Sequence, residues 1–519
     1  MVHSSRFLKH AVLMAGLGLL SLGVASPVLA SDRLVIAEAK GDRGLPAPYA
    51  HQKAGPAYIY TSYIFDTLLG QDKTGAPAPA LASSWTVSDD GLSYDLMLNP
   101  KAQWHDGKPV TAEDVAFTFS YMKEHPYNFV SVANVEKIES LAADHVRLTL
   151  KERDAGMITS KLISLPILPR HIYEKVAIPE RFTGKQATIG SGPYKLVSYD
   201  KAQGRYLYER NETYYLGQPK YKQLAAIRMT PSTAIEAIAN GQVDLYNSFP
   251  MEQLGAARKA GLSVMTYLSN HPVKLLFNHQ GKFKQTEMRQ ALAYAIDRQR
   301  LVDVAYPGKG EVAETGFFQR ESPWHKDQDD PDYKYDKEKA SQLFMEQGWI
   351  FDDGVWSQNG DPVVLQLVTN KSFKKLATVL AEQLTDFGIK TETRVMEDAA
   401  MHAAFRDGAF DIALETASTM GDPDSVIFRI FSKSPKSDKY FVNGRMKKLL
   451  IDQAAASSVG ERAAMMHEFQ ALYARELPAY MLVNPLWAVV HSANVEPLYM
   501  KTGISFGIPM AIPKRILMP

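Results

Sequence analysis

The sequence of 519 residues contains no cysteine. This absence excludes disulfide scaffolds, thiolate zinc sites, iron–sulfur clusters, cysteine nucleophiles and a lipid-modified N-terminal cysteine. An excess of one charge is also missing, because 58 Lys and Arg residues stand against 57 Asp and Glu residues. We therefore expect no nucleic-acid partner and no attraction to an anionic membrane surface. The length predicts three or four domains, at roughly 150 residues each.

Residues 1–30 have the pattern of a secretory signal peptide. Arg6 and Lys9 precede the uncharged apolar run 11–24, and Val28-Leu29-Ala30 offers small residues at a cleavage site. The run is short for a membrane span, and no later uncharged apolar run reaches the length of one. Together with the missing lipid-anchor cysteine, this pattern predicts a free periplasmic protein rather than a tethered one.

The first half of the mature chain contains short strands and well-marked turns. Residues 34–37 form an apolar strand, and the aromatic-rich stretch that begins near Tyr58 has helical spacing with one face buried. Alternating apolar residues over 92–98 predict a hairpin strand. Thr111 is the expected N-cap of a helix, with Asp114 bonding back to it.

The second half alternates between helices and strands. Thr286 is the expected cap of an amphipathic helix. Further expected helices are 337–347, 373–387 and 398–407, ending at Gly348, Gly388 and Gly408, and expected strands are 363–368, 389–395 and 410–414. This order predicts a mostly parallel α/β sheet.

Motifs for catalysis or for a resident metal are missing from the chain. Gly190-Ser191-Gly192 fits neither a phosphate loop nor a nucleophile elbow. His105 and Asp106 lie near acidic residues, but their roles in a turn explain them without a metal. We therefore expect no enzyme, no cofactor and no metal site; a secreted hydrolase is the alternative of a different class.

Five segments resemble, in this order, segments of the family 5 extracytoplasmic solute-binding proteins. They are 85–94 (WTVSDDGLSY), 104–115 (WHDGKPVTAEDV), 190–194 (GSGPY), 210–217 (RNETYYLG) and 288–298 (MRQALAYAIDR). This family includes the dipeptide-, oligopeptide- and nickel-binding components of ABC importers, and the likeness covers essentially the whole mature chain.

The resemblance implies the α/β, two-lobed fold of periplasmic binding proteins, with three domains, a hinge and a ligand cleft between the lobes. Domain I would comprise residues 31–75, 187–275 and 485–519, domain II residues 76–186, and domain III residues 276–484. The hinge would consist of the two chain crossings near 275 and 485. The implied partners are a small-molecule or peptide solute and an inner-membrane ABC permease with its ATPase, and we expect a monomer.

One departure from the family pattern affects the expected solute. Peptide binders of the family resemble W-x-x-D-Y-x-D-P after the strand that here ends near 414, and the first Asp of that motif receives the α-ammonium of the peptide. Asp422-Pro423-Asp424 matches the end of the motif, which puts Thr419 at the Asp position and Thr416 at the Trp position. A neutral Thr cannot balance a desolvated ammonium. The usual anchor for a free peptide N-terminus is therefore missing at this position.

The candidate solute-binding residues follow from this position and from domain I. Ligands in open α/β sheets gather outside the carboxyl ends of the strands, which favours the segment after the strand 410–414. The candidates are Thr416, Ala417, Ser418, Thr419, Met420, Arg43, Tyr58 and Trp487. A peptide or peptide-like solute is the first expectation; a chelated metal of the nickel type, an opine or another non-peptide solute is the alternative. An added chemoreceptor or signalling role is compatible with the same sequence.

Overall fold

The computed structural model describes residues 32–52, 55–72, 74–269, 271–320, 322–327, 331–417, 422–431, 441–497 and 517. The predicted signal peptide and three of the candidate site residues, Ser418, Thr419 and Met420, lie outside these ranges. Among the described residues, no helix is both long and apolar enough to cross a membrane.

Twelve strands form one large mixed sheet, in the order β19-β18-β20-β13-β21-β11-β1-β10-β9-β8, with β12 and β14 also paired to β21. These strands are β1 Arg33–Glu38, β8 Tyr194–Asp200, β9 Arg205–Arg210, β10 Gln223–Arg228, β11 Leu245–Tyr246, β12 Ser263–Leu268, β13 Val273–Phe277, β14 Gly310–Val312, β18 Val364–Asn370, β19 Lys390–Met396, β20 Ile412–Thr416 and β21 Ala479–His491. The pairs β18–β19, β18–β20, β1–β10 and β1–β11 are parallel, and the other pairs are antiparallel. The prediction of a mostly parallel sheet is therefore correct for β18, β19 and β20 but wrong for the sheet as a whole.

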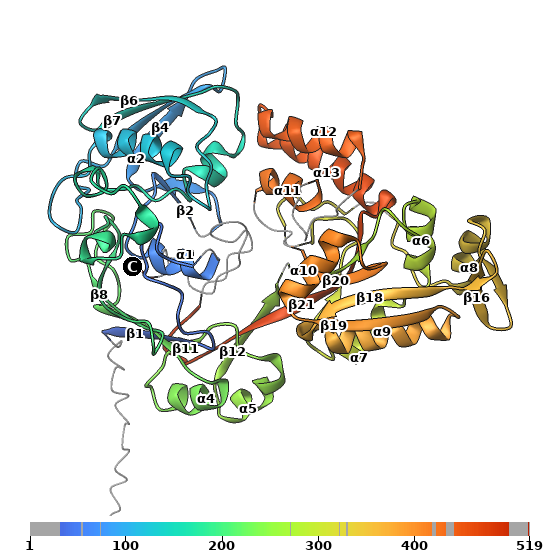
Figure 1. Ribbon diagram of the computed structural model, residues 1–519. Coiled ribbons are helices and arrows are strands. Elements are labelled where there is room, and N and C mark those ends of the chain that lie inside the picture. Colours follow the sequence, from blue (N-terminus) through green and yellow to red (C-terminus); the bar gives the residue numbers. More distant parts are fainter. Residues whose placement is uncertain are drawn as a thin grey trace, which may run out of the picture. The chain divides into compact units, whose positions relative to one another are not determined.

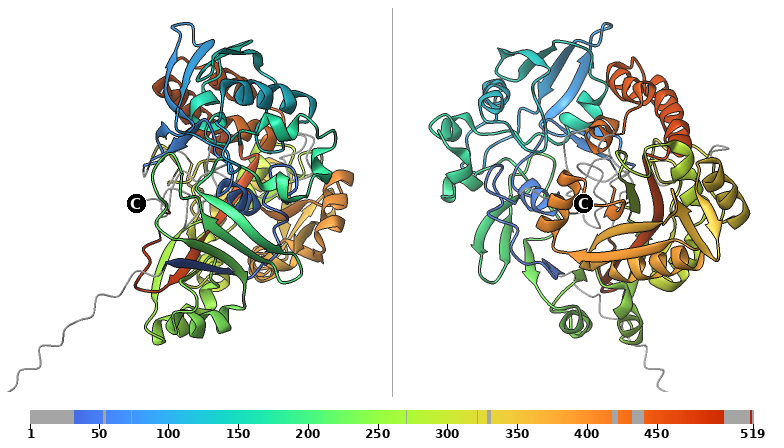
Figure 2. Two further views of the ribbon diagram at one scale, coloured as in Figure 1. Left: turned by 90° about the vertical axis from the view of Figure 1, so that its left-hand side faces the viewer. Right: turned by 45° about the vertical axis from the view of Figure 1, so that its right-hand side comes forward.

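The long strand β21 joins the two groups of strands (Figure 1), and the views in Figure 2 show it running on without a break. Residues 479–485 pair with β13 and β14, whereas residues 486–491 pair with β12 and β11. At the change of partner, the backbone N–H of Ser269 donates to the carbonyl oxygen of Pro485 at 2.9 Å. The two expected hinge crossings thus lie directly beside each other.

Residues 82–150 form a separate four-stranded antiparallel sheet, in the order β4-β5-β7-β6, with helix α2 packed on it. Its elements are β4 Ala82–Val87, β5 Ser93–Leu98, α2 Ala112–Glu124, β6 Val135–Ala142 and β7 His145–Leu150. The predicted hairpin strand is confirmed. The predicted cap is also confirmed, because Thr111 and Asp114 form a reciprocal capping box at the start of α2.

The predicted Gly helix stops are confirmed: Gly348, Gly388 and Gly408 follow the ends of helices α8 Lys337–Glu346, α9 Lys374–Asp386 and α10 Asp398–Asp407. All three have positive φ angles, which a glycine adopts without strain. The predicted cap at Thr286 is wrong. That residue is the first of helix α6 Thr286–Tyr294, and Gln285 precedes it without a side-chain cap.

The aromatic stretch near Tyr58 is shorter as a helix than its spacing suggested. Helix α1 spans Gly55–Ser62, and the aromatic residues in and after it are buried on more than one face, because the helix lies inside a tyrosine-rich core. The remaining helices are α3 Arg170–Tyr173, α4 Pro231–Ala239, α5 Leu254–Lys259, α7 Arg298–Ala305, α11 Val426–Ile430, α12 Gly444–Asp452 and α13 Val459–Glu476. The remaining strands are β2 Leu69–Gln71, β3 Pro77–Pro79, β15 Ile350–Asp352, β16 Val355–Gln358 and β17 Asp361–Pro362.

Candidate functional site

The segment expected to select the solute begins inside a strand rather than after it. Strand β20 extends to Thr416, so the expected strand end at 414 is two residues short, and Thr416 pairs with Val273 of β13. The side chain of Thr416 is exposed. The next residue, Ala417, is buried, and its N–H donates to the carbonyl oxygen of Pro272 at 2.9 Å. Thr416 and Ala417 therefore lie next to the first chain crossing.

The acidic residues that could replace a missing anchor already have cationic neighbours. Asp422 forms a two-pronged ion pair with the guanidinium of Arg462, and its side chain is 10% exposed. Glu415 is buried and lies directly across the sheet from buried Lys274. Asp422 thus has a cation from the protein itself, and Lys274 is the cation opposite Glu415 on the neighbouring strand.

Arg43 and Tyr58, both predicted to bind solute, are structural residues in this conformation. The guanidinium of Arg43 pairs with the buried carboxylate of Glu38, which also accepts the hydroxyl of Tyr60 at 2.7 Å. The ring of Tyr58 is 3% exposed, and its hydroxyl donates to the carbonyl oxygen of Ser164 at 2.7 Å. The charge of Arg43 is therefore balanced inside the protein, and Tyr58 is a core residue.

Trp487 belongs to a half-exposed aromatic group at the chain crossing. It lies on β21 opposite Tyr267 of β12, with their ring centroids 6.4 Å apart. The ring of His271, in the connection between β12 and β13, is 5.8 Å from that of Trp487. Burial, and then the positive charge of Arg429, lower the pKa of His271 to about 4. His271 is therefore neutral at physiological pH.

Arg429 on α11 differs from Arg43 in having no ion-pair or hydrogen-bond partner among the described residues. Burial lowers its pKa, although part of the side chain is open to solvent. An unpaired guanidinium near the neutral ring of His271 can receive a carboxylate or another acceptor group of a solute. Sequence reasoning missed both residues. The only signal was the position of His271 beside the expected crossing near 275.

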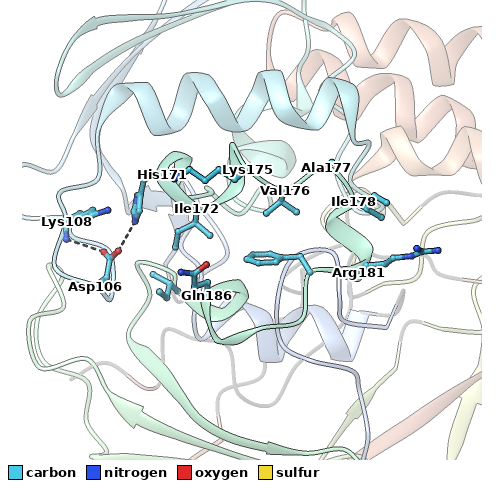
Figure 3. Close-up of a pocket in the computed structure, with 12 residues that line it drawn as sticks. Asp106, Lys108, His171, Ile172, Lys175, Val176, Ala177, Ile178, Arg181 and Gln186 are labelled. Atoms are coloured by element: carbon cyan, nitrogen blue, oxygen red, sulfur yellow. Dashed lines mark hydrogen bonds and ion pairs between the residues drawn. The ribbon is translucent and has the colours of Figure 1, made fainter.

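A hollow of about 590 Å³ lies in the region of α3 (Figure 3). Figure 3 shows Asp106 between Lys108 and His171; its carboxylate accepts the backbone N–H of Lys108 at 3.3 Å and lies 2.7 Å from Nε2 of His171. Burial raises the pKa of Asp106, but the hydrogen bonds from His171 and Lys108 and the positive charges of these two residues together outweigh it and hold that pKa below its usual value. Asp106 thus has the structural role in a turn that the sequence suggested. No group of three or more possible metal ligands occurs in the described part of the chain.

Two histidines whose pKa values are lowered by burial make the stability of the fold depend on pH. Burial lowers the pKa of His279 to about 3, and Nε2 of its ring lies 2.8 Å from the carbonyl oxygen of Pro478. His271 and His279 stay neutral in the folded protein at pH 5, whereas the unfolded chain protonates both with a pKa near 6.5. The unfolded state therefore binds more protons, and stability falls as the pH decreases from about 6.5.

We expect the unfolding free energy to fall by about 2 kcal/mol for each of these two histidines between pH 7 and pH 5. Urea denaturation at both pH values measures this change. In the variant His279→Gln, whose side-chain amide can still donate to the Pro478 carbonyl, the decrease should be smaller by the contribution of one histidine. If the unfolding free energy of His279→Gln falls by as much as that of the wild type, the role given to His279 in the pH dependence is contradicted.

The sequence matches the model of the family described as "Bacterial extracellular solute-binding proteins, family 5 Middle" over residues 76–438, more than half of the chain. The chain belongs to this family. Its members are binding proteins and extracytoplasmic, so the resemblance seen in the five sequence segments and the α/β two-lobed fold are both confirmed.

Individual members of family 5 are similar along most of the chain. The oligopeptide-binding protein AppA of Bacillus subtilis is 29% identical over 443 residues, covering 80% of this chain and 80% of that protein. The nickel-binding periplasmic protein of Escherichia coli is 27% identical over 440 residues, covering 79% and 80%. The crystal structure of the ABC transporter substrate-binding protein CtaP from Listeria monocytogenes has a TM-score of 0.78 at 25% identity, covering 93% of this chain and 99% of that one.

Proposed function

We propose that this family 5 protein is the periplasmic solute-binding component of an ABC importer, and that it captures a peptide or peptide-like solute between its lobes. The observation that carries the proposal is the pair of adjacent crossings at Ser269 and Pro485, next to Trp487 and His271 and to the positive charge of Arg429. Aromatic rings and a few polar groups around a concave site are typical of solute binding. The similarity to an oligopeptide-binding protein supports a peptide as the solute.

The proposed organisation keeps the expected domains: domain I of 31–75, 187–275 and 485–519, domain II of 76–186, and domain III of 276–484. Domains I and II form the N-terminal lobe, and domain III forms the C-terminal lobe. The change of partners along β21 near residue 485 supports this division. We further propose that Thr416 to Met420 and Trp487 line the cleft, whereas Arg43 and Tyr58 support it from within.

The proposed partners and location follow from the same function. The loaded protein, a monomer freed by removal of its signal peptide and not anchored by a lipid, delivers the solute to an inner-membrane permease. It catalyses no reaction. The second candidate is a chelated metal in place of a peptide, which the similarity to a nickel-binding relative favours.

Hinge closure gives this proposal a direct test, because a solute held between two lobes stabilises the closed form. The low-mass extract released from the heat-denatured protein is the probe. Adding it back to solute-free protein should lower the radius of gyration in small-angle X-ray scattering. An unchanged radius, while the extract raises the melting temperature, would show binding without closure and contradict the proposal.

A further inference from the structure

We propose that residues 154–161 and the pair Asp422 and Asp424 form an interlobe latch, which sets the affinity for solute without touching it. The inference rests on the proposed function, because that proposal places residues 154–161 in domain II and the two aspartates in domain III. Asp422 follows the proposed cleft segment Thr416 to Met420 by two residues.

Direct contacts join the two sides of the interlobe latch. The backbone N–H of Ala155 donates to the carbonyl oxygen of Ala454 at 2.7 Å. The ammonium nitrogen of Lys161 is 3.8 Å from Oδ2 of Asp424. Segments more than 250 residues apart in the sequence are thus joined by a backbone hydrogen bond and by an ion pair.

The domain II side of the interlobe latch is organised by a buried acid. Asp154 is 4% exposed and forms an ion pair with Lys161 of the single-turn π-helix Met157–Lys161. Its carboxylate also accepts the backbone N–H of Gly156 at 3.1 Å and the side-chain amide of Asn134 at 3.4 Å. These bonds hold the segment in place before the other side approaches.

The domain III side of the interlobe latch is organised by a buried cation. The guanidinium of Arg462 is 2% exposed, pairs with both Asp422 and Asp424, and donates from Nε to Gln453 at 2.6 Å. It also lies over the ring of Trp324, 5.1 Å from its centroid. Both aspartates are therefore fixed by partners within domain III and have little freedom to move aside.

Gly156 is the point at which the two sides come closest. A Cβ atom there would lie 2.9 Å from Oδ2 of Asp424 and 3.3 Å from Oδ2 of Asp422. The backbone of Gly156 has φ −86° and ψ −4°, a conformation open to any residue. The absence of a side chain at this position is therefore required by the approach of domain III and not by the local backbone.

The two sides of the interlobe latch can also separate, because they do not meet inside a packed hydrophobic core. A cavity of about 640 Å³ lies beside it, lined from both domains by Tyr94, Arg153, Ile158, Trp324, Val459 and Arg462 among others. A contact of a few polar bonds next to open space can form and break as the lobes close and open. Any group that obstructs it destabilises the closed form alone, and the apparent solute affinity falls by the same factor as the population of that form.

The test uses Gly156→Ala, with Gly184→Ala as its matched control. Gly184 is also in domain II and also has a negative φ, −72°, but an added Cβ there would meet nothing within 4 Å. Because the chain has no cysteine, Lys175→Cys and Lys447→Cys place one spin label on each lobe, at exposed positions. Electron paramagnetic resonance then reports the distance between the labels while the low-mass extract from heat-denatured wild-type protein is added.

We expect Gly156→Ala to need about tenfold more extract than the wild type for half-maximal closure, because overpacking of a tight contact is costly. Its melting temperature without solute should stay unchanged or rise, since Ala replaces Gly in a helical backbone conformation. Gly184→Ala should close as the wild type does. The latch proposal would be overturned if Gly156→Ala closed at the same concentration of extract as the wild type. A fall in the melting temperature of solute-free Gly156→Ala would overturn it too. A wild-type protein that does not close at all would instead overturn the proposed function.

Discussion

Replacing Arg462 with Met should lower the unfolding free energy by about 3–5 kcal/mol, because it leaves the carboxylate of Asp422 without its cation and takes from Asp424 the nearer of its two cations. Arg462 is 2% exposed and holds Asp422, Asp424 and Gln453 in one network. An unpaired carboxylate in such a place must be protonated or rehydrated, and either change opens the packing around it. Urea denaturation of the full-length protein measures the loss.

The chain offers a matched control for this substitution in Arg445. Its guanidinium also makes a two-pronged pair, with Glu468, but both side chains are about half exposed. Arg445→Met should therefore cost less than about 1 kcal/mol. Adding Asp422→Asn and Asp424→Asn to Arg462→Met should recover part of the loss by removing the unpaired charges. Equal losses for the two arginine variants would contradict the role given to Arg462.

Ordinary dipeptides with a free N-terminus should bind weakly or not at all, and Thr419→Asp should raise their affinity about tenfold or more. At the position of Thr419, the peptide binders of the family resemble one another in having an Asp. The side chain of Thr419 offers a hydroxyl group but no charge. The nearest acids in the sequence, Glu415 and Asp422, already face Lys274 and Arg462. A new carboxylate would therefore be the first one available to a solute ammonium at this position.

Calorimetry with a small panel of dipeptides measures that effect. Thr419→Asn, which is close in size to Asp but neutral, separates the charge from the change in shape and should leave the affinity low. Binding of ordinary dipeptides at micromolar affinity or tighter by the unmodified protein would contradict the prediction. It would show that another acid serves as the anchor.

Local sequence patterns predict a helix or strand boundary well when the interactions that form that boundary are between residues close in the sequence. The capping box at Thr111 and the left-handed glycine after α10 at Gly408 depend on residues a few positions apart, so both could be found in the sequence. The end of β20 at Thr416 could not, because it depends on pairing with Val273, more than a hundred residues away. The same is true of the mixed sheet, because the direction of β21 depends on its pairing with strands more than a hundred residues earlier in the chain.

The candidate site also depends on contacts between residues far apart in the sequence, which the sequence alone does not reveal. Trp487 stays a prediction from the sequence. The sequence does not reveal that Arg43 has Glu38 as its ion-pair partner. Arg429 is the reverse case: within the described ranges it has no ion-pair partner, and its exposure depends on the fold around it. Charge pairing is a tertiary property, and the sequence lists charges without their partners.

Mass spectrometry of the protein as purified tests the central claim most directly. Under native conditions the protein should carry one bound solute, which mild denaturation releases. We expect the released mass to fragment at amide bonds into amino-acid residues, as a peptide or a peptide-like solute does. A metal chelate, or any solute without amide bonds, would contradict the claim that this protein captures peptides.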